Sequence, residues 1–220
     1  MLFRSKRAFI IADMPWGTYQ TSPAQAFANA AELMAAGAQM VKLEGGECMA
    51  ETIHFLTARG IPVCGHLGLT PQSVHALGGY RVQGKTLAAT QRVLDDALAL
   101  RDAGAFAILF EALPPESAAY IRERLDLICY GIGAGPHLDG QLVISHDILG
   151  NFVGDIAPKF VSRYANIDQI VEAAFRTYAN EVRTKQFPAP KHWYAIDAAE
   201  AAALTQHPHS PHDAIARKSA

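Results

Sequence analysis

The chain has 220 residues, of which 50% are hydrophobic and 18% are charged, and its formal net charge is −2. This is the composition of a globular protein long enough to bury one sizeable core. The small negative charge gives no basis for binding nucleic acid or an anionic membrane. No apolar run approaches the roughly 20 residues that a transmembrane helix needs. The three cysteines share no CxxC spacing, so we expect no disulfides and a cytoplasmic location.

Six short apolar runs alternate with Ala-rich segments of helical period. The runs are nearly continuous in apolar character, as strands buried on both faces of a parallel sheet are. They cover residues 8–15, 39–46, 61–68, 105–114, 127–135 and 141–150. Segments 22–38 and 85–105 predict helices, and Ser22 suits the N-cap of the first. Gly37 and Gly104 suit the left-handed position that often follows a helix.

The composition changes near residue 195. The sequence from there on is polar, rich in Ala, His and Pro, and without a clear period. Such a stretch buries too little apolar surface to order itself. We therefore predict one catalytic domain over residues 1–194, followed by a disordered tail over 195–220.

Repeated alternation of strands and helices predicts an α/β fold with right-handed crossovers. The strand-like runs end in polar groups, namely Asp13, then Lys42 and Glu44, then His66, then Glu111. A doubly wound sheet concentrates its chemistry near one switch point. In a (β/α) barrel, the C-terminal ends of several strands converge on one pocket. The pattern favours the barrel, of which this chain holds about six strands.

Each polar group also has a purely structural explanation. Asp13 suits a cap of the turn before Pro15, and Lys42 and Glu44 suit a buried ion pair. However, Lys42 and Glu44 are two residues apart, so on a strand they share one face. Two adjacent charges inside a strand are hard to explain by stability alone. The segment 45–46, Gly-Gly, would also let a ligand approach the backbone closely.

His66 and Glu111 are the other two candidates. His66 precedes residues 70–73, which suit the start of a new helix near a pocket rim. Six apolar residues precede Glu111, which suits a general base, although a salt-bridged glutamate at a strand end is the alternative. The glycines of 131–141 lack the spacing of a dinucleotide-binding loop. The adjacent residues of 145–147, Ser-His-Asp, cannot form a hydrolase triad.

Together these groups favour one kind of chemistry. Two or three carboxylates without a Cys or His cluster suit a hard cation, most plausibly Mg²⁺. Lys42 suits a carboxylate or a developing enolate oxygen, and Glu111 suits proton abstraction next to a carbonyl. The residues alone therefore predict enolate chemistry on a 2-oxo acid.

Several long motifs resemble those of the ketopantoate hydroxymethyltransferase family. The motifs are ADMPWGTYQ, VKLEGG, CGHLGLTPQSVHALGGYRVQGK, FEALPPE, GIGAGPHLDGQ and HDILG with PKFV. They follow the family's order from about residue 8 to about residue 190. The resemblance implies a (β/α)8 barrel, assembly into homo-oligomeric rings, and hydroxymethyl transfer from 5,10-methylenetetrahydrofolate to 3-methyl-2-oxobutanoate. The product would be 2-dehydropantoate, a precursor of pantothenate.

The resemblance also implies residue roles. By their positions in the motifs, Asp13 and Glu44 match carboxylates of the Mg²⁺ site, and Asp13 and Lys42 match residues that hold the keto acid. His66 matches a pocket histidine that contacts substrate, and Glu111 matches the base. Mg²⁺ would then chelate the keto oxygen and carboxylate of the substrate and acidify its C3 proton.

One departure leaves alternatives open. The family's barrel needs eight strands, and its first two strand–helix units, with a Gly-Asp-Ser segment, have no counterpart in this sequence. We therefore expect an incomplete barrel whose activity is reduced. The alternatives are a related Mg²⁺-dependent lyase of 2-oxo acids, which would not need folate, and a catalytically impaired fragment of the family.

Overall fold

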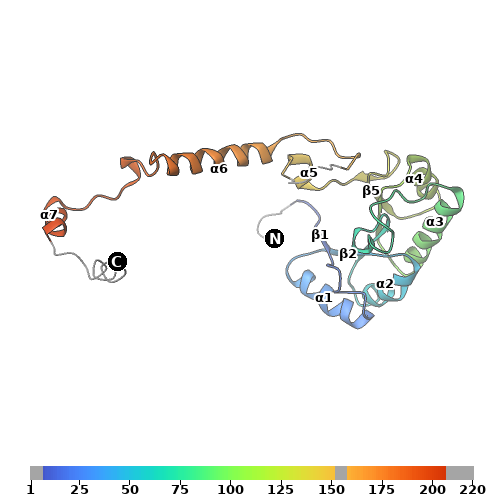
Figure 1. Cartoon of the computed structure of the whole chain (residues 1–220). Coiled ribbons are helices and arrows are strands. Elements are labelled where there is room, and N and C mark those ends of the chain that lie inside the picture. The colour runs from blue at the N-terminus through green and yellow to red at the C-terminus, as the bar shows by residue number, and fades with distance from the viewer. Residues whose placement is uncertain (1–6, 152–157, 207–220) are drawn as a thin grey trace, which may run out of the picture. The chain divides into compact units, whose positions relative to one another are not determined.

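Six parallel strands, paired in chain order, form one sheet (Figure 1). A computed structural model describes residues 7–151 and 158–206. The strands are β1 (Ile11–Asp13), β2 (Met40–Glu44), β3 (Val63–Gly68), β4 (Ala107–Glu111), β5 (Ile128–Ile132) and β6 (Gly140–Gln141). The predicted α/β fold with a six-stranded part of a barrel is confirmed.

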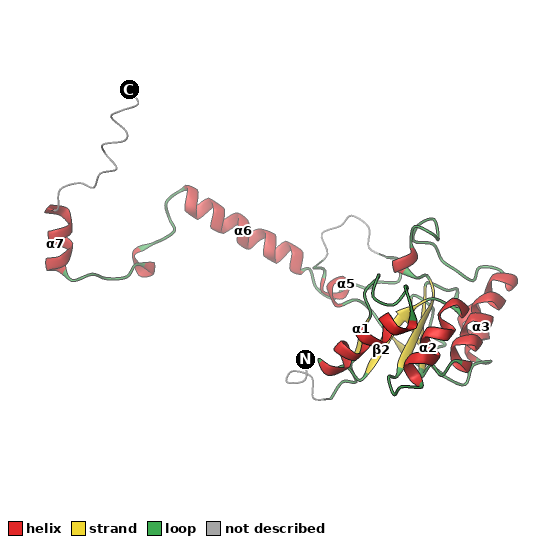
Figure 2. Cartoon of the chain, turned by 90° about the horizontal axis from the view of Figure 1, so that it is seen from below, coloured by secondary structure: helices red, strands yellow, loops and turns green. Residues whose placement is uncertain are grey.

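Helices connect the strands and cover one face of the sheet. They are α1 (Pro23–Ala35), α2 (Ala50–Thr57), α3 (Leu87–Asp102) and α4 (Pro115–Arg122), with the 3₁₀ turns η1 (Glu47–Met49) and η2 (Pro71–Ser73). Figure 2 shows α1, α2 and α3 side by side against the strands. The Ser22 side chain accepts a hydrogen bond from Gln25 N–H, as an N-cap does. Gly37 and Gly104 both have positive φ, as predicted.

The two faces of the sheet differ in the size of the apolar cluster that each carries and in the chemistry of their side chains. The face toward the helices carries the main core, which includes Val41, Leu43 and Phe110. The opposite face carries a smaller apolar cluster that includes Met40 and Leu109. Because side chains alternate along a strand, the polar residues in register with that smaller cluster share its face. The sheet therefore presents its strand-end charges on the inner side of the curl.

Two local predictions are wrong. Within the run 141–150, Gln141 alone belongs to a strand, β6, and α5 (Ser145–Leu149) follows it. The apolar residues between them are partly exposed, so they are not the buried strand that their composition indicated. Residues 70–73 form the short turn η2 rather than a full helix, and the Thr70 side chain makes no capping hydrogen bond.

The chain divides into two compact units, of which the first ends at Ala165 and the second begins at Asn166. The second contains α6 (Ile167–Arg183), the 3₁₀ turn η3 (Pro190–His192) and α7 (Ala198–Gln206). The division therefore differs from the predicted boundary after residue 194. Within the predicted tail, Ala198–Gln206 form α7, because alanine-rich sequence favours a helix there. Residues 207–220 lie outside the described residues.

Within the described residues, no helix is both long enough and apolar enough to cross a membrane.

Candidate active site

The structure brings all five predicted site residues together at the C-terminal ends of β1 to β4. Strand register places Asp13 beside Lys42, and Glu44 beside His66. Gly68, two residues beyond His66, pairs with Glu111. The parallel strands therefore deliver these side chains to one edge of the sheet, on its inner face.

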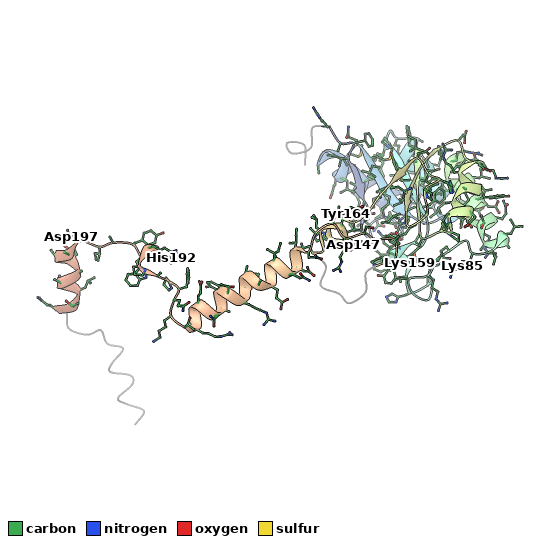
Figure 3. All side chains as sticks on the ribbon, turned by 90° about the horizontal axis from the view of Figure 1, so that it is seen from above. Lys85, Asp147, Lys159, Tyr164, His192 and Asp197 are labelled. Atoms are coloured by element: carbon green, nitrogen blue, oxygen red, sulfur yellow. The ribbon has the colours of Figure 1, made fainter. Side chains whose placement is uncertain are left out.

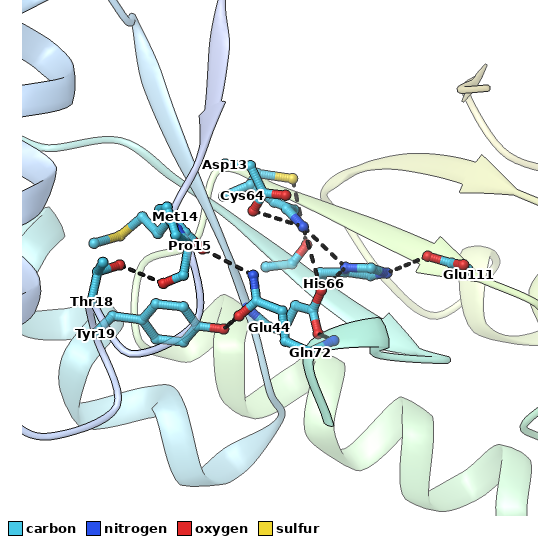
Figure 4. A network of polar contacts seen from close by, with 12 residues as sticks. Asp13, Met14, Pro15, Thr18, Tyr19, Glu44, Cys64, His66, Gln72 and Glu111 are labelled. Carbon is cyan, nitrogen blue, oxygen red and sulfur yellow. Dashed lines mark hydrogen bonds and ion pairs between the residues drawn. The ribbon is translucent and has the colours of Figure 1, made fainter. Parts of the chain in front are cut away.

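Lys42 lies between the two carboxylates of the cluster. Its Nζ is 2.9 Å from Asp13 Oδ1 and 3.7 Å from Glu44 Oε1 (Figure 4). Both carboxylates thus lie within 4 Å of one ammonium nitrogen, on the same side of the sheet. The Glu44 side chain is only 4% exposed, whereas that of Asp13 is 60% exposed.

His66 links Glu44 to Glu111. Its Nδ1 lies 3.5 Å from Glu44 Oε1 and 3.4 Å from Lys42 Nζ, while its Nε2 lies 3.2 Å from Glu111 Oε2. The geometry of the last contact is not that of a hydrogen bond, so within the described residues Nε2 has no hydrogen-bond partner. This buried nitrogen faces the carboxylate that we predicted to be the base.

Burial and charge compete at the centre of the cluster. Burial alone would lower the pKa of His66, but its contacts with Glu111 and Glu44 raise that pKa above its usual value. Burial alone would raise the pKa of Glu44, but His66, the Gln72 N–H and Lys42 together lower it. The arrangement therefore favours an ionised Glu44 beside a protonated His66.

A ring of hydrogen bonds, which the sequence analysis missed, holds Glu44 in place. The Glu44 backbone N–H donates to the Tyr19 hydroxyl at 3.1 Å, and that hydroxyl donates to Gln72 Oε1 at 2.6 Å. The Gln72 backbone N–H closes the ring by donating to Glu44 Oε2 at 2.9 Å. Gln72 Nε2 also donates to Met14 O, so the ring ties together the segments after β1, β2 and β3.

A tight backbone junction fixes the position of Glu111. A Cβ atom on Gly68, whose φ is +87°, would collide with the Glu111 carbonyl oxygen. The next residue, Ala112, has a φ of 50°, which is uncommon for a residue with a side chain. Its N–H donates to Ile132 O at 3.0 Å, which holds this turn against β5. Local strain of this kind often accompanies functional sites.

Comparison with the sequences of known proteins assigns the chain to a family. The family model described as ketopantoate hydroxymethyltransferase matches residues 1–190. The 3-methyl-2-oxobutanoate hydroxymethyltransferase of Cereibacter sphaeroides (strain ATCC 17029 / ATH 2.4.9) is 51% identical over 192 residues, which are 87% of this chain and 69% of the relative. The enzyme of the same name from Paracoccus denitrificans is 54% identical over 187 residues, 84% of this chain and 67% of the relative.

The chain belongs to the ketopantoate hydroxymethyltransferase family.

Among solved structures, phosphonopyruvate hydrolase aligns with a TM-score of 0.47 and 16% identity, over 89% of this chain and 68% of that chain. A likeness this distant has no bearing on function. The assignment to a family of transferases rests on the sequence relatives.

The carboxylates of this ketopantoate hydroxymethyltransferase family member fit a hard cation. Mg²⁺ commonly binds one or two protein carboxylates and completes its octahedron with water and substrate oxygens. Asp13 and Glu44 supply such a pair, and the described residues contain no group of three or more His, Cys, Asp or Glu that could hold a metal. Burial raises the pKa of Cys64 to about 12, so no thiolate is available there. The metal role of Asp13 and Glu44 stays a prediction.

Proposed function

We propose that the protein transfers a hydroxymethyl group to 3-methyl-2-oxobutanoate. The reaction consumes 5,10-methylenetetrahydrofolate and water, and releases 2-dehydropantoate and tetrahydrofolate. The observation that carries the proposal is the convergence of Asp13, Lys42, Glu44, His66 and Glu111 at one strand edge. The names of the relatives support the same reaction.

Lys42 is suited to hold the substrate. Its side chain is 13% exposed, so the ammonium is largely shielded from water. Electrostatic attraction is stronger in such a site than in bulk water. We assign Lys42 to the negative oxygens of the 2-oxo acid, and therefore also to the enolate oxygen that forms when the C3 proton leaves.

Glu111 is the proposed base. Its side chain is 14% exposed, and its carboxylate lies 3.2 Å from His66 Nε2. A carboxylate beside a cationic or donor imidazole is held in one orientation, which favours proton abstraction at a fixed point. Glu111 removes the C3 proton. Water releases the methylene unit of the folate as formaldehyde and leaves tetrahydrofolate, and the enolate carbon attacks that formaldehyde, whose oxygen takes up a proton to become the new hydroxyl. His66 positions the base.

Asp13 and Glu44 would hold Mg²⁺, together with the substrate and water. A bound Mg²⁺ polarises the keto group and thereby makes the C3 proton more acidic. The Gln72 N–H fixes one oxygen of Glu44, so the orientation of this ligand is set before the metal binds. We further propose a cytoplasmic homo-oligomer as the working form.

Deuterium exchange at C3 of 3-methyl-2-oxobutanoate tests the chemistry. With Mg²⁺ and without folate, the wild-type chain should exchange this proton, as followed by NMR. Glu111→Gln should slow the exchange at least about 100-fold, because a general base contributes roughly 10²–10⁴ to a rate, and should leave Mg²⁺ affinity unchanged. Glu116→Gln, an exposed glutamate at the start of α4, is the matched control.

Two results would contradict the proposal. Exchange by Glu111→Gln at the wild-type rate would remove Glu111 as the base. Cleavage of a 2-oxo acid without folate, in the absence of 2-dehydropantoate formation when methylenetetrahydrofolate is added, would favour a lyase instead.

A further inference from the structure

Two glycines follow Glu44 directly, and side chains of the protein itself occupy the space beside both. Gly45 has a φ of +127°, and a Cβ atom there would lie 2.7 Å from Met49 Cγ. Gly46 has a φ of −88°, outside the left-handed region, but a Cβ atom on it would collide with the carboxylate of Asp96. Contacts within the chain therefore account for the glycine pair, and one of them joins the end of β2 to a distant helix.

Asp96 caps the helical segment that follows the glycines. It is partly buried and lies in the second half of α3, the helix that begins just after Lys85 (Figure 3). The N-cap of η1 is Gly46, which has no side chain to accept a hydrogen bond. Instead, the Glu47 N–H at the start of η1 donates to Asp96 Oδ1 at 2.8 Å. A carboxylate is favourable there because the first N–H groups of a helix carry partial positive charge.

This cap acts on the chain next to Glu44. Glu44 is the last residue of β2 and Glu47 is the first of η1, so the glycine pair is all that separates them. The Gly45 N–H donates to His66 O at 3.2 Å, which ties the beginning of the segment to β3. Glycines permit many backbone angles, so without an anchor the segment would leave the end of β2 free to shift. Asp96 supplies that anchor from the helix layer.

Glu44 is thereby held from two directions. The ring of hydrogen bonds through Tyr19 and Gln72 fixes the Glu44 N–H and one carboxylate oxygen. Asp96 fixes the chain immediately after Glu44. A residue that orients a metal ligand can change metal affinity without contacting the metal.

We propose that Asp96 is a positioning residue for Glu44. Its carboxylate fills the space beside Gly46 and sets the position of residues 45–47. Through them it sets the direction of the Glu44 side chain toward Mg²⁺ and His66. The inference rests on the proposed function, because that function makes Glu44 a metal ligand. In this role the shape of the Asp96 side chain matters more than its charge.

Substitutions at Asp96 separate shape from charge. Asp96→Asn keeps an acceptor oxygen in the same place, so C3 exchange, followed by NMR, and Mg²⁺ affinity, measured by calorimetry without substrate, should stay within about twofold of wild type. Asp96→Ala removes the acceptor, and Asp96→Glu keeps the charge but displaces the oxygen. Both should slow C3 exchange and weaken Mg²⁺ binding by about tenfold, as loss of an outer partner of a metal ligand does.

Asp139 is the matched control. Its Oδ2 also accepts a backbone hydrogen bond at 2.8 Å, from the Cys129 N–H, but near the beginning of β5, away from the strand ends that carry the cluster. Asp139→Ala should lower the urea midpoint of unfolding, as Asp96→Ala should. It should nevertheless leave C3 exchange per folded molecule and Mg²⁺ affinity within about twofold of wild type, because distant sites act independently. The comparison distinguishes positioning from general stabilisation.

A paired variant tests the contact itself. Gly46→Ala introduces the Cβ atom that collides with Asp96, so it should slow C3 exchange at least as much as Asp96→Ala does. Gly46→Ala combined with Asp96→Ala removes the collision. The double variant should therefore exchange the proton no more slowly than Asp96→Ala alone, a non-additive result that indicates direct contact.

C3 exchange and Mg²⁺ affinity equal to wild type in Asp96→Ala would overturn the proposal. Additive losses in the paired variant, equal functional losses in Asp139→Ala, or a loss in Asp96→Asn as large as that in Asp96→Ala would also overturn it. If Asp96→Ala does not fold, the comparison of Asp96→Asn with Asp96→Glu decides. Failure of the wild-type chain to exchange the C3 proton while it binds Mg²⁺ would instead overturn the proposed function, because Mg²⁺ affinity still reports the placement of Glu44.

Discussion

Asp13 and Glu44 contact the same ammonium, yet they lie in very different surroundings. Glu44 ends β2, which pairs with β1 on one side and β3 on the other, and its side chain is 4% exposed. Both of its carboxylate oxygens have protein partners, namely Lys42 and His66 on one and Gln72 N–H on the other. Asp13 ends an edge strand of the sheet, its side chain is 60% exposed, and its one ion pair among the described residues is with Lys42.

The difference shows how the fold divides two tasks. A buried carboxylate is costly unless charges and donors surround it, so Glu44 is stabilised by its neighbours and also holds them in place. An exposed carboxylate gains little from a single ion pair, so Asp13 adds little to stability and can change its partners at small cost. Glu44 therefore organises the site, and Asp13 is free to serve a ligand.

Paired substitutions test this division most directly. Glu44→Gln should lower the free energy of unfolding by about 2 kcal/mol, because hydrogen bonds to a buried charge are worth roughly 1.5–3 kcal/mol. Asp13→Asn should change it by less than about 0.5 kcal/mol, as exposed pairs do. Urea denaturation near pH 6 measures both, and Mg²⁺ titration of each variant should show weaker binding in both cases. Equal loss of stability in the two variants would contradict the contrast.

Removal of the Tyr19 hydroxyl should affect the position of Glu44 without changing the Glu44 side chain itself. Tyr19 is 1% exposed, and burial raises its pKa to about 12, so it remains a neutral donor and acceptor. Tyr19→Phe leaves the Glu44 N–H and Gln72 Oε1 without this partner, at a cost of about 1–2 kcal/mol for buried polar groups. We also expect weaker Mg²⁺ binding, because Glu44 loses its fixed orientation.

A matched tyrosine controls for the loss of a hydroxyl. Among the described residues, the Tyr120 hydroxyl makes one long hydrogen bond, 3.4 Å to Gln91 Oε1, on the helices away from the cluster. Tyr120→Phe should leave unfolding and Mg²⁺ affinity close to wild type. If Tyr19→Phe has the same stability and Mg²⁺ affinity as Tyr120→Phe, the ring of hydrogen bonds through Tyr19 and Gln72 does not position Glu44.

The sequence predicted the strand-end groups because strand geometry is local. A spacing of two residues placed Lys42 and Glu44 on one face, and parallel pairing then carried His66 and Glu111 to the same edge. It did not predict Tyr19 and Gln72, because their bonds to Glu44 join residues 25 and 28 positions away through loops. No periodic pattern specifies the path of such loops.

Two segments show how far composition predicts local structure. The run 141–150 has the composition of a buried strand, but burial depends on the surrounding structure, and Ile144 is 54% exposed. Most of the run takes other conformations, including α5. In α7, within the predicted tail, alanine-rich sequence favours a helix. Composition alone therefore does not decide which element a segment forms.

The smallest expected effect is the dependence of Glu44's contribution on pH. The folded-state pKa of Glu44 lies below its usual value of 4.5, so its stabilisation is present above pH 4.5 and is lost as the pH falls through that lowered pKa. The pKa of His66 is raised above 6.5, so its stabilisation is present below pH 6.5 and is lost as the pH rises through the raised value. The two windows overlap between pH 4.5 and 6.5.

The difference in unfolding free energy between wild type and Glu44→Gln should therefore be largest in that window and smaller on either side, as measured by urea denaturation from pH 4 to 9. A difference that stays constant over this range would mean that the charge on His66 does not stabilise Glu44, and the surroundings of Glu44 would then differ from those of Asp13 in burial alone.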